Sequence, residues 1–250
     1  MSEILKNFVS PKSLFEIGHN ARLKKYPDGT CELLVCDTPI FGTSGWESTK
    51  SRKRNKDEKQ NEAESVERSI RRARQQLRDY ALCNSFTFFV TLTLDQKKIN
   101  RYDMVEITEK LRVWLDNKVR RNGLKYVLVP ELHKDGAVHF HGFFNDALPA
   151  VDSGHFDRRR HKIYNLPSWK FGFTTAIKLY GSYNSAVSYV CKYIGKDTKK
   201  IGGRWYYSGG DLSLPEVEFF DVEIETAFGS SSGSEFTIPN VDYRFVSFKE

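Results

Sequence analysis

Two histidines flank a phenylalanine near the middle of the chain, in His139-Phe140-His141, and Glu131 lies eight residues before the first of them. Because alternate residues of a β-strand point to the same face, the two imidazoles would share one side of a sheet. A carboxylate and two imidazoles with open positions suit Mg²⁺ or Mn²⁺ acting on phosphate oxygens, whereas three imidazoles would favour zinc. The pattern predicts a divalent metal site, and the alternative is a solvated strand face.

The length of the turn before the histidines decides whether Glu131 can reach them. A two-residue Asp-Gly turn would place Glu131 opposite Phe140, on the wrong face of the sheet. A loop with one more residue, such as a type I turn followed by a bulge at Gly136, places the carboxylate on the histidine face. We expect the longer loop, because only this loop brings the acid to the histidines. Its expected pairs are Glu131 with His141 and His133 with His139.

A candidate nucleophile follows some fifty residues later, in Tyr193-Ile194-Gly195-Lys196-Asp197. A free phenol has a pKa of about 10, so it needs a nearby cation to attack at neutral pH. On a helix over residues 182–196, Lys196 would lie about one turn from Tyr193. Tyr189 and Lys192 form an overlapping match, and Tyr189 is a second candidate nucleophile. Ordinary packing of a tyrosine-rich helix is the alternative.

The remaining periodicities predict an α+β fold, a central antiparallel sheet flanked by helices and resembling a ferredoxin-like or RRM-like sheet. The expected helices are 64–82, 103–122 and 182–196, and the expected strands are 21–25, 30–36, 86–94, 125–132, 138–144 and 171–179. The expected organisation is an N-terminal hairpin extension over 1–45, a charged linker over 46–62, a catalytic domain over 63–215 and a C-terminal tail over 216–250.

The net charge of +7 favours an anionic partner such as nucleic acid. Two groups of arginines could contact phosphates, because the guanidinium fork matches phosphate oxygens; a solvated helix face is the alternative for the first group. The groups are Arg68, Arg71, Arg72, Arg74 and Arg78 on the first helix, and Arg158, Arg159 and Arg160 in an irregular segment. The aromatic candidates for base stacking, for which core packing is the favoured alternative, are Trp169, Trp205, Tyr206 and Tyr207.

Several classes of protein are disfavoured. The four cysteines form no Cys-x-x-Cys pair, which favours a reducing compartment. The longest apolar stretch, residues 86–94, is too short to cross a bilayer, and the N-terminus does not resemble a signal peptide. We therefore expect a cytoplasmic protein that does not bind membranes. The sequence contains no GxxxxGK phosphate loop, so we expect strand separation to depend on another protein.

Three motifs in a fixed order resemble those of the HUH endonucleases, the superfamily that includes rolling-circle replication initiators. Phe89-Val90-Thr91-Leu92-Thr93-Leu94 is similar to the first motif, His139-Phe140-His141 to the second, and Tyr193-x-x-Lys196 to the third. The arginine-rich helix that leads into the first motif resembles phage and plasmid replication proteins of the filamentous-phage gene II type. The resemblance covers roughly residues 64–210.

The resemblance implies a fold with the histidine strand central in an antiparallel sheet and the tyrosine helix beside it. It implies Glu131 as the third ligand of Mg²⁺ or Mn²⁺, beside His139 and His141. The implied activity is cleavage of one DNA strand at a replication origin, in which Tyr193 forms a 5′-phosphotyrosine and leaves a free 3′-hydroxyl. The implied partners are single-stranded origin DNA and, in a bacterial host cell, a host helicase and DNA polymerase.

Two other readings stay open. A mobilisation relaxase or a single-tyrosine transposase would use the same chemistry, but relaxases usually carry more histidines and these transposases are usually shorter. A non-catalytic RRM-like nucleic-acid-binding module would leave the paired histidines unexplained, and the chain lacks the Lys/Arg-Gly-Phe-aromatic pattern of such modules.

Overall fold

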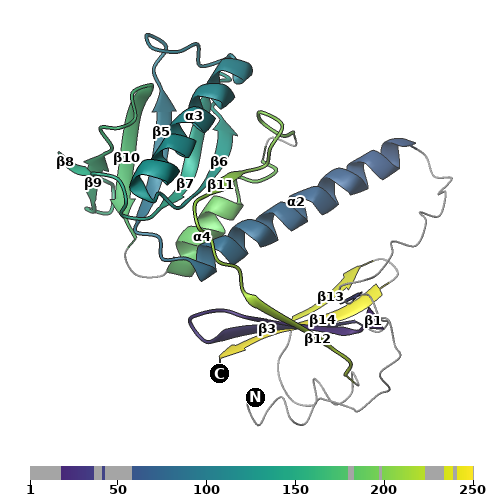
Figure 1. The fold of residues 1–250 in the computed structure, drawn as a ribbon. Coiled ribbons are helices and arrows are strands. Elements are labelled where there is room, and N and C mark those ends of the chain that lie inside the picture. The colour runs from purple at the N-terminus through teal and green to yellow at the C-terminus, as the bar shows by residue number, and fades with distance from the viewer. Residues whose placement is uncertain are drawn as a thin grey trace. The chain divides into compact units, whose positions relative to one another are not determined.

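The computed structural model describes residues 18–36, 41–42, 58–179, 183–196, 199–222, 234–238 and 241–249. The chain forms two compact units, one of residues 56–214 and one that combines residues 1–55 with residues 215–250 (Figure 1). Antiparallel sheets form the basis of both units, and helices flank the sheet of the larger one. The expected α+β class is therefore confirmed.

In the described part of the chain, the larger unit contains three helices and one seven-stranded antiparallel sheet. The helices are α2 (Glu58–Cys83), α3 (Met104–Asn122) and α4 (Tyr183–Cys191). The strands in spatial order are β11 (Tyr207–Gly209), β6 (Tyr126–Leu132), β7 (Val138–Phe144), β5 (Phe88–Leu94), β10 (Gly172–Lys178), β9 (Lys162–Asn165) and β8 (Val151–Phe156). The histidine strand, β7, thus lies between β6 and β5.

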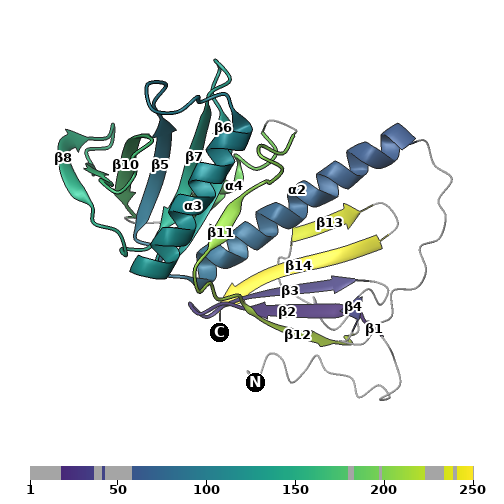
Figure 2. The ribbon, with the colours of Figure 1, turned by 45° about the horizontal axis from the view of Figure 1, so that its top comes forward.

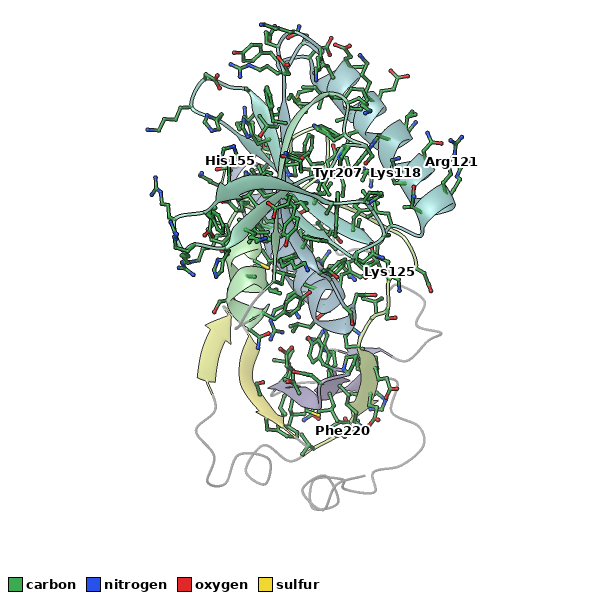
Figure 3. The ribbon with its side chains drawn as sticks, turned by 90° about the vertical axis from the view of Figure 1, so that its left-hand side faces the viewer. Lys118, Arg121, Lys125, His155, Tyr207 and Phe220 are labelled. Carbon is green, nitrogen blue, oxygen red and sulfur yellow. The ribbon has the colours of Figure 1, made fainter. Side chains whose placement is uncertain are left out.

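Helix α3 covers one face of this sheet (Figure 2). Asp103 caps its start by accepting hydrogen bonds from two backbone N–H groups, and Gly123 ends it with a φ of 70°. The apolar stripe of α3 includes Leu111 and Leu115 and packs with the even-numbered residues of the strands, such as Phe140. Figure 3, seen from the β8 edge, shows α3 on one side of the sheet and α4 on the other.

Helices α2 and α4 pack together against the opposite face of the sheet. Leu77 of α2 and Val190 of α4 are buried with Val129 of β6 and Phe143 of β7. Helix α2 begins six residues before the expected start, inside the expected linker, and linker residues 46–57 lie outside the described residues. The odd-numbered residues of β7, including both histidines, point to the face of the sheet that α2 and α4 cover.

Helix α4 is shorter than expected: it ends at Cys191, whereas the expected end was residue 196. Residues 192–196 form turns in which four backbone N–H groups donate three residues back, as from Tyr193 to Val190 at 3.1 Å. Gly195 then adopts a φ of 79°, a left-handed conformation that favours glycine. The candidate tyrosine therefore lies in a turn that follows the helix.

The basic segment before β10 was expected to be irregular, and it forms a hairpin of β8 and β9 instead. Asp157 stabilises the turn by accepting hydrogen bonds from the backbone N–H groups of Arg159 at 2.8 Å and His161 at 2.7 Å. Arg160 adopts a φ of 67°, which is uncommon for a residue with a side chain. The turn holds Arg158, Arg159 and Arg160 exposed at the tip of the hairpin.

Gly142 follows the second histidine in β7 and has no space for a side chain. A Cβ atom there would lie 1.9 Å from the carbonyl oxygen of Val127 in the neighbouring strand β6. We expect Gly142→Ala to lower the free energy of unfolding by about 3 kcal/mol, because the sheet backbone must separate. Urea unfolding followed by tryptophan fluorescence would measure this. Gly154→Ala, where φ is 74° and the space is open, should cost about 1 kcal/mol; equal costs would contradict the prediction.

The smaller unit contains a five-stranded antiparallel sheet in its described residues. Its strands in spatial order are β12 (Glu216–Phe220), β2 (Ala21–Lys25), β3 (Thr30–Cys36), β14 (Val241–Lys249) and β13 (Ser234–Ile238), and a separate pair joins β1 (Gly18–His19) to β4 (Phe41–Gly42). The hairpin of β2 and β3 has the expected bounds. Strands from the expected C-terminal tail complete its sheet on both sides, a pairing that local sequence patterns do not reveal.

None of the helices in the described part of the chain combines the length and the apolar character that a membrane-spanning helix needs.

Candidate active site

The turn between β6 and β7 has the expected type but a different register. Gly136 donates its backbone N–H to His133 at 2.8 Å and has a φ of 82°, as in a type I turn followed by a glycine bulge. Glu131 therefore shares a face with the histidines, as expected. It pairs with His139 instead of His141, so the expected pairs are wrong by two positions. A shift of two residues leaves every side chain on the same face.

The Glu131 carboxylate nevertheless reaches His141, its diagonal neighbour across the two strands. Its Oε2 lies 2.9 Å from Nε2 of His141. Its other oxygen, Oε1, accepts a hydrogen bond from the Lys196 ammonium group. The carboxylate thus joins a residue of the histidine motif to a residue of the tyrosine motif, which lies 65 positions later in the sequence.

Two threonines of β5, the other neighbour of β7 in the sheet, contact the histidines on the same face. Thr91 pairs with His141 and Thr93 with His139 in the sheet register. The Thr91 hydroxyl lies 3.0 Å from Nδ1 of His141, and the Thr93 hydroxyl lies 3.4 Å from Nδ1 of His139. The threonines of the first motif therefore line the histidine face and orient the rings. On the same face His133, an exposed residue, stacks on His139 with 4.5 Å between ring centroids.

The hydrogen bonds of His141 define the position of its proton. Burial lowers the pKa of His141 most strongly, although Glu131 opposes this effect, so the ring is neutral at pH 7. A neutral ring beside a carboxylate donates its Nε2–H to Glu131. Nδ1 then accepts a hydrogen bond from the Thr91 hydroxyl.

Tyr193 lies directly on this network. Its ring stacks on that of His141, with 4.7 Å between centroids and 11° between planes. The Tyr193 hydroxyl donates a hydrogen bond to the Tyr189 hydroxyl, and the Lys196 ammonium lies 5.7 Å from the Tyr193 ring centroid. Burial raises the pKa of Tyr193, and the Tyr189 and Glu131 groups raise it further. The phenol is therefore protonated at neutral pH in the absence of a bound substrate.

The three motifs that converge here lie within one family match: residues 87–198 match the replication-associated protein family of the ORF2 and gene II protein type. This segment is similar to that family. The match confirms the resemblance to replication proteins of phage and plasmid type, and it includes β5, β7 and the tyrosine turn. Comparison with curated proteins and with solved structures gave no match.

Arg74 of α2, outside the segment that matches the replication-associated family, holds the tyrosine turn in place. Its guanidinium group donates two hydrogen bonds, of 3.1 and 2.8 Å, to the backbone carbonyl of Ile194. The side chain of Ile194 is fully buried beside Ile70 and Leu77. Arg74 was a candidate for DNA contact, and the structure places its guanidinium on the residue that follows Tyr193. Sequence reasoning did not detect this role, because the contact spans 120 residues.

Two other arginine candidates have their described contacts within helix α2. Arg68 donates to the backbone of its own helix, and Arg71 lies 3.9 Å from Glu67. Among the aromatic candidates, Trp169 is buried, and Trp205 donates its indole N–H to Ser69 at 2.9 Å. These tryptophans are packing residues.

The two candidate tyrosines, Tyr189 and Tyr193, have different surroundings. Tyr189 is 50% exposed and meets Phe89 edge to face at 5.9 Å. Tyr193 is less exposed and is the one that stacks on His141. Asp197, the last residue of the tyrosine motif, lies outside the described residues. The geometry thus distinguishes Tyr193 from Tyr189 by its contact with the histidine motif.

No group of three or more His, Cys, Asp or Glu side chains is arranged to hold a metal ion in the part of the chain that the structure describes. Glu131, His139 and His141 do lie on one face and offer one carboxylate and two neutral-ring nitrogens. Burial lowers the pKa of His139, with a smaller effect from His133, so this ring is also neutral at pH 7. The donor chemistry fits a divalent cation, and the Lys196 ammonium is the cation now held by Glu131.

Proposed function

We propose that this protein is a rolling-circle replication initiator that cuts one DNA strand at an origin through attack by Tyr193. The observation that supports this most directly is the stacking of the Tyr193 ring on His141, whose Nε2 faces the same carboxylate that binds Lys196. A nucleophile, two imidazoles, a carboxylate and an ammonium group thus meet on one face of the sheet. That combination suits phosphoryl transfer to a tyrosine.

In the proposed reaction, the phenolic oxygen of Tyr193 forms a bond to the scissile phosphorus, and the bond from phosphorus to the 3′-oxygen breaks. The phenolic proton leaves, and the departing 3′-oxygen takes up a proton. The products are a 5′-phosphotyrosine and a free 3′-hydroxyl that can prime synthesis. The energy of the original ester is kept in the phosphotyrosine, so a 3′-hydroxyl can attack it later and rejoin the strand.

The surrounding side chains have separate roles in this proposal. The Tyr189 hydroxyl accepts the hydrogen bond of the phenol and so gives its proton a first acceptor. Lys196 lies over the Tyr193 ring and can stabilise the phenolate. Arg74 keeps the turn that carries Tyr193 against α2. Each role follows from a contact within the chain.

Glu131, His139 and His141 would hold Mg²⁺ or Mn²⁺ in this proposal. When bound, such a cation would polarise the phosphate and neutralise its developing negative charge. Binding through Nε2 of His141 requires the proton to be on Nδ1, which is the other neutral form of the ring. The Thr91 hydroxyl suits both forms, because it can donate to Nδ1 or accept from it.

Replacing Thr91 by valine tests this support. The substitution keeps the β-branched shape and removes the hydroxyl that contacts Nδ1 of His141. We expect the dissociation constant for Mn²⁺ to rise by roughly 10- to 100-fold, because partners of metal-bound histidines have effects of this size. Titration calorimetry would measure it. Thr175→Val, an exposed threonine next to Thr91 on the same face, is the control and should leave the constant unchanged. Equal affinities of the Thr91 variant and the wild type would contradict the role.

The function itself is tested with single-stranded DNA from the replicon that encodes the protein, labelled at its 3′ end and incubated with Mn²⁺. A 5′-phosphotyrosine leaves the 3′ fragment on the protein, so a labelled adduct that survives denaturation supports the proposal. Retention of DNA without an adduct would favour a non-catalytic binding module. An adduct formed only with DNA from a transfer or transposon end would favour a relaxase or transposase.

The partners in this proposal are origin DNA and host proteins of the bacterial cytoplasm. The sequence has no GxxxxGK phosphate loop of a helicase motor, so a host helicase would separate the strands. A host DNA polymerase would extend the free 3′-hydroxyl.

A further inference from the structure

The active-site residues that lie on strands belong to two rows that cross the sheet. The first row consists of Glu131, His139, Thr93 and Phe173, which pair in succession across β6, β7, β5 and β10. In the second row, Val129, His141, Thr91 and Thr175 pair in the same way. Because directly paired residues share a face, Phe173 points to the side on which the histidines lie. Two strand spacings, about 10 Å, separate it from His139.

Phe173 is an exposed phenylalanine and the second residue of strand β10. It is 66% exposed, compared with 49% for Phe156 and 41% for Phe219. The next residue on its face, Thr175, is exposed as well. Helix α4 lies on this side of the sheet, over the end that carries Phe143 and Val127 (Figure 3). The flat apolar ring of Phe173 is therefore accessible on the face of the sheet that carries the histidines.

The chemistry around the ring favours a nucleobase as its occupant. The neighbours of Phe173 in its row are a threonine and a histidine, so the surface is a single flat ring in polar surroundings, unlike an apolar groove for a peptide. The chain has a net charge of +7, which favours a polyanion. Aromatic rings on open sheet faces bind bases by stacking, because every base has a flat face.

We propose that Phe173 is a stacking platform for a base of the single-stranded DNA, close to the phosphate that Tyr193 attacks. The inference rests on the proposed function for the path of the DNA strand, which would cross β7, β5 and β10 along the row of His139, Thr93 and Phe173. It adds a residue that fixes the position of the DNA relative to the histidines. The stacking contact does not depend on the identity of the base, so the platform would set the register of the DNA and leave sequence choice to other contacts.

The experiment compares two probes, the oligonucleotide dT12 and a 12-mer of the same backbone that lacks all bases. Binding is measured by fluorescence anisotropy in EDTA, so that no cleavage occurs. The wild type should bind dT12 more tightly than the abasic probe. In Phe173→Ala this preference should fall about tenfold, since stacking on one aromatic ring contributes an effect of that order. Phe173→Trp should keep the preference.

Phe156→Ala is the matched control. Tyr164 contacts Phe88 on the α3 side of the sheet, and Lys162, two residues earlier in β9, points to the same side. Phe156 pairs with Lys162, so the Phe156 ring lies on the face opposite to that of Phe173. This variant should keep the wild-type preference. The platform would be overturned if Phe173→Ala kept the preference for dT12, or if it lost the same affinity for both probes. It would also be overturned if sedimentation showed the wild type to be a dimer and Phe173→Ala a monomer, since Phe173 would then lie in a contact between two copies of the chain.

The same measurements separate this inference from the proposed function. Wild-type protein that forms the covalent adduct but shows no preference for dT12 would overturn the platform and leave the nicking activity. Wild-type protein that prefers dT12 through Phe173 and never forms an adduct would retain the platform and overturn the nicking activity.

Discussion

Tyr193→Phe is expected to abolish the covalent adduct between the protein and 3′-labelled single-stranded DNA. The substitution removes one oxygen atom, the proposed nucleophile, and keeps the ring that stacks on His141. Loss of a covalent nucleophile lowers turnover by roughly 10³-fold or more, so no adduct should be visible on a denaturing gel. Binding of the uncut DNA should be retained, because the variant keeps the packing of the tyrosine turn.

Tyr189→Phe is the matched control for this result. It removes the hydroxyl that accepts the hydrogen bond from Tyr193 and leaves the nucleophile in place. We expect slower adduct formation, by about tenfold, because one neutral hydrogen bond contributes roughly 1 kcal/mol. An adduct that persists in Tyr193→Phe and disappears in Tyr189→Phe would contradict the assignment. Loss of the adduct in both variants would show that both tyrosines are required.

The face that carries the site could be predicted from the sequence, whereas the register could not. The period of two along β7 places His139 and His141 together whatever strand lies next to them. Asp135-Gly136 is compatible with a two-residue turn and with a longer loop, and the longer loop was expected because only it brings Glu131 to the histidine face; Gly136 has the positive φ of that loop. Several odd-length loops between β6 and β7 would keep Glu131 on the histidine face while pairing it with a different residue. Only the ladder hydrogen bonds decide this, and they pair Glu131 with His139.

The features that sequence reasoning missed depend on contacts between distant segments. The end of α4 is one of them, because the helical pattern continues past Cys191 while Gly195 packs against Ile70 of α2 and ends the turn. The link from Arg74 to Ile194 has the same origin. Phe173 carried a different signal: it lies in an alternating strand, where the pattern does not tell a core residue from an exposed one, and in the described part of the chain its side chain is 66% exposed.

His141 connects the groups of the site, and its substitution should have the second large effect. The ring contacts Glu131 through Nε2, Thr91 through Nδ1 and Tyr193 through its face. In His141→Phe the flat ring remains beneath Tyr193, while both nitrogens are lost. We expect the dissociation constant for Mn²⁺ to rise by more than about 100-fold, beyond the effect of losing a supporting partner, and the adduct to disappear with it.

His133→Ala is the control for this experiment, since His133 is exposed on the same face and stacks on His139, outside the contacts that join His141 to Glu131. It should change Mn²⁺ affinity and adduct yield by less than about threefold, as expected for an exposed side chain outside the donor set. Calorimetry and the labelled-DNA assay measure the two quantities on the same samples. If His141→Phe still forms the adduct at the wild-type rate, the imidazole serves only as a surface for Tyr193. If His133→Ala loses Mn²⁺ while His141→Phe keeps it, the cation binds to the His133 and His139 pair, and the cation role of Glu131 and His141 is wrong.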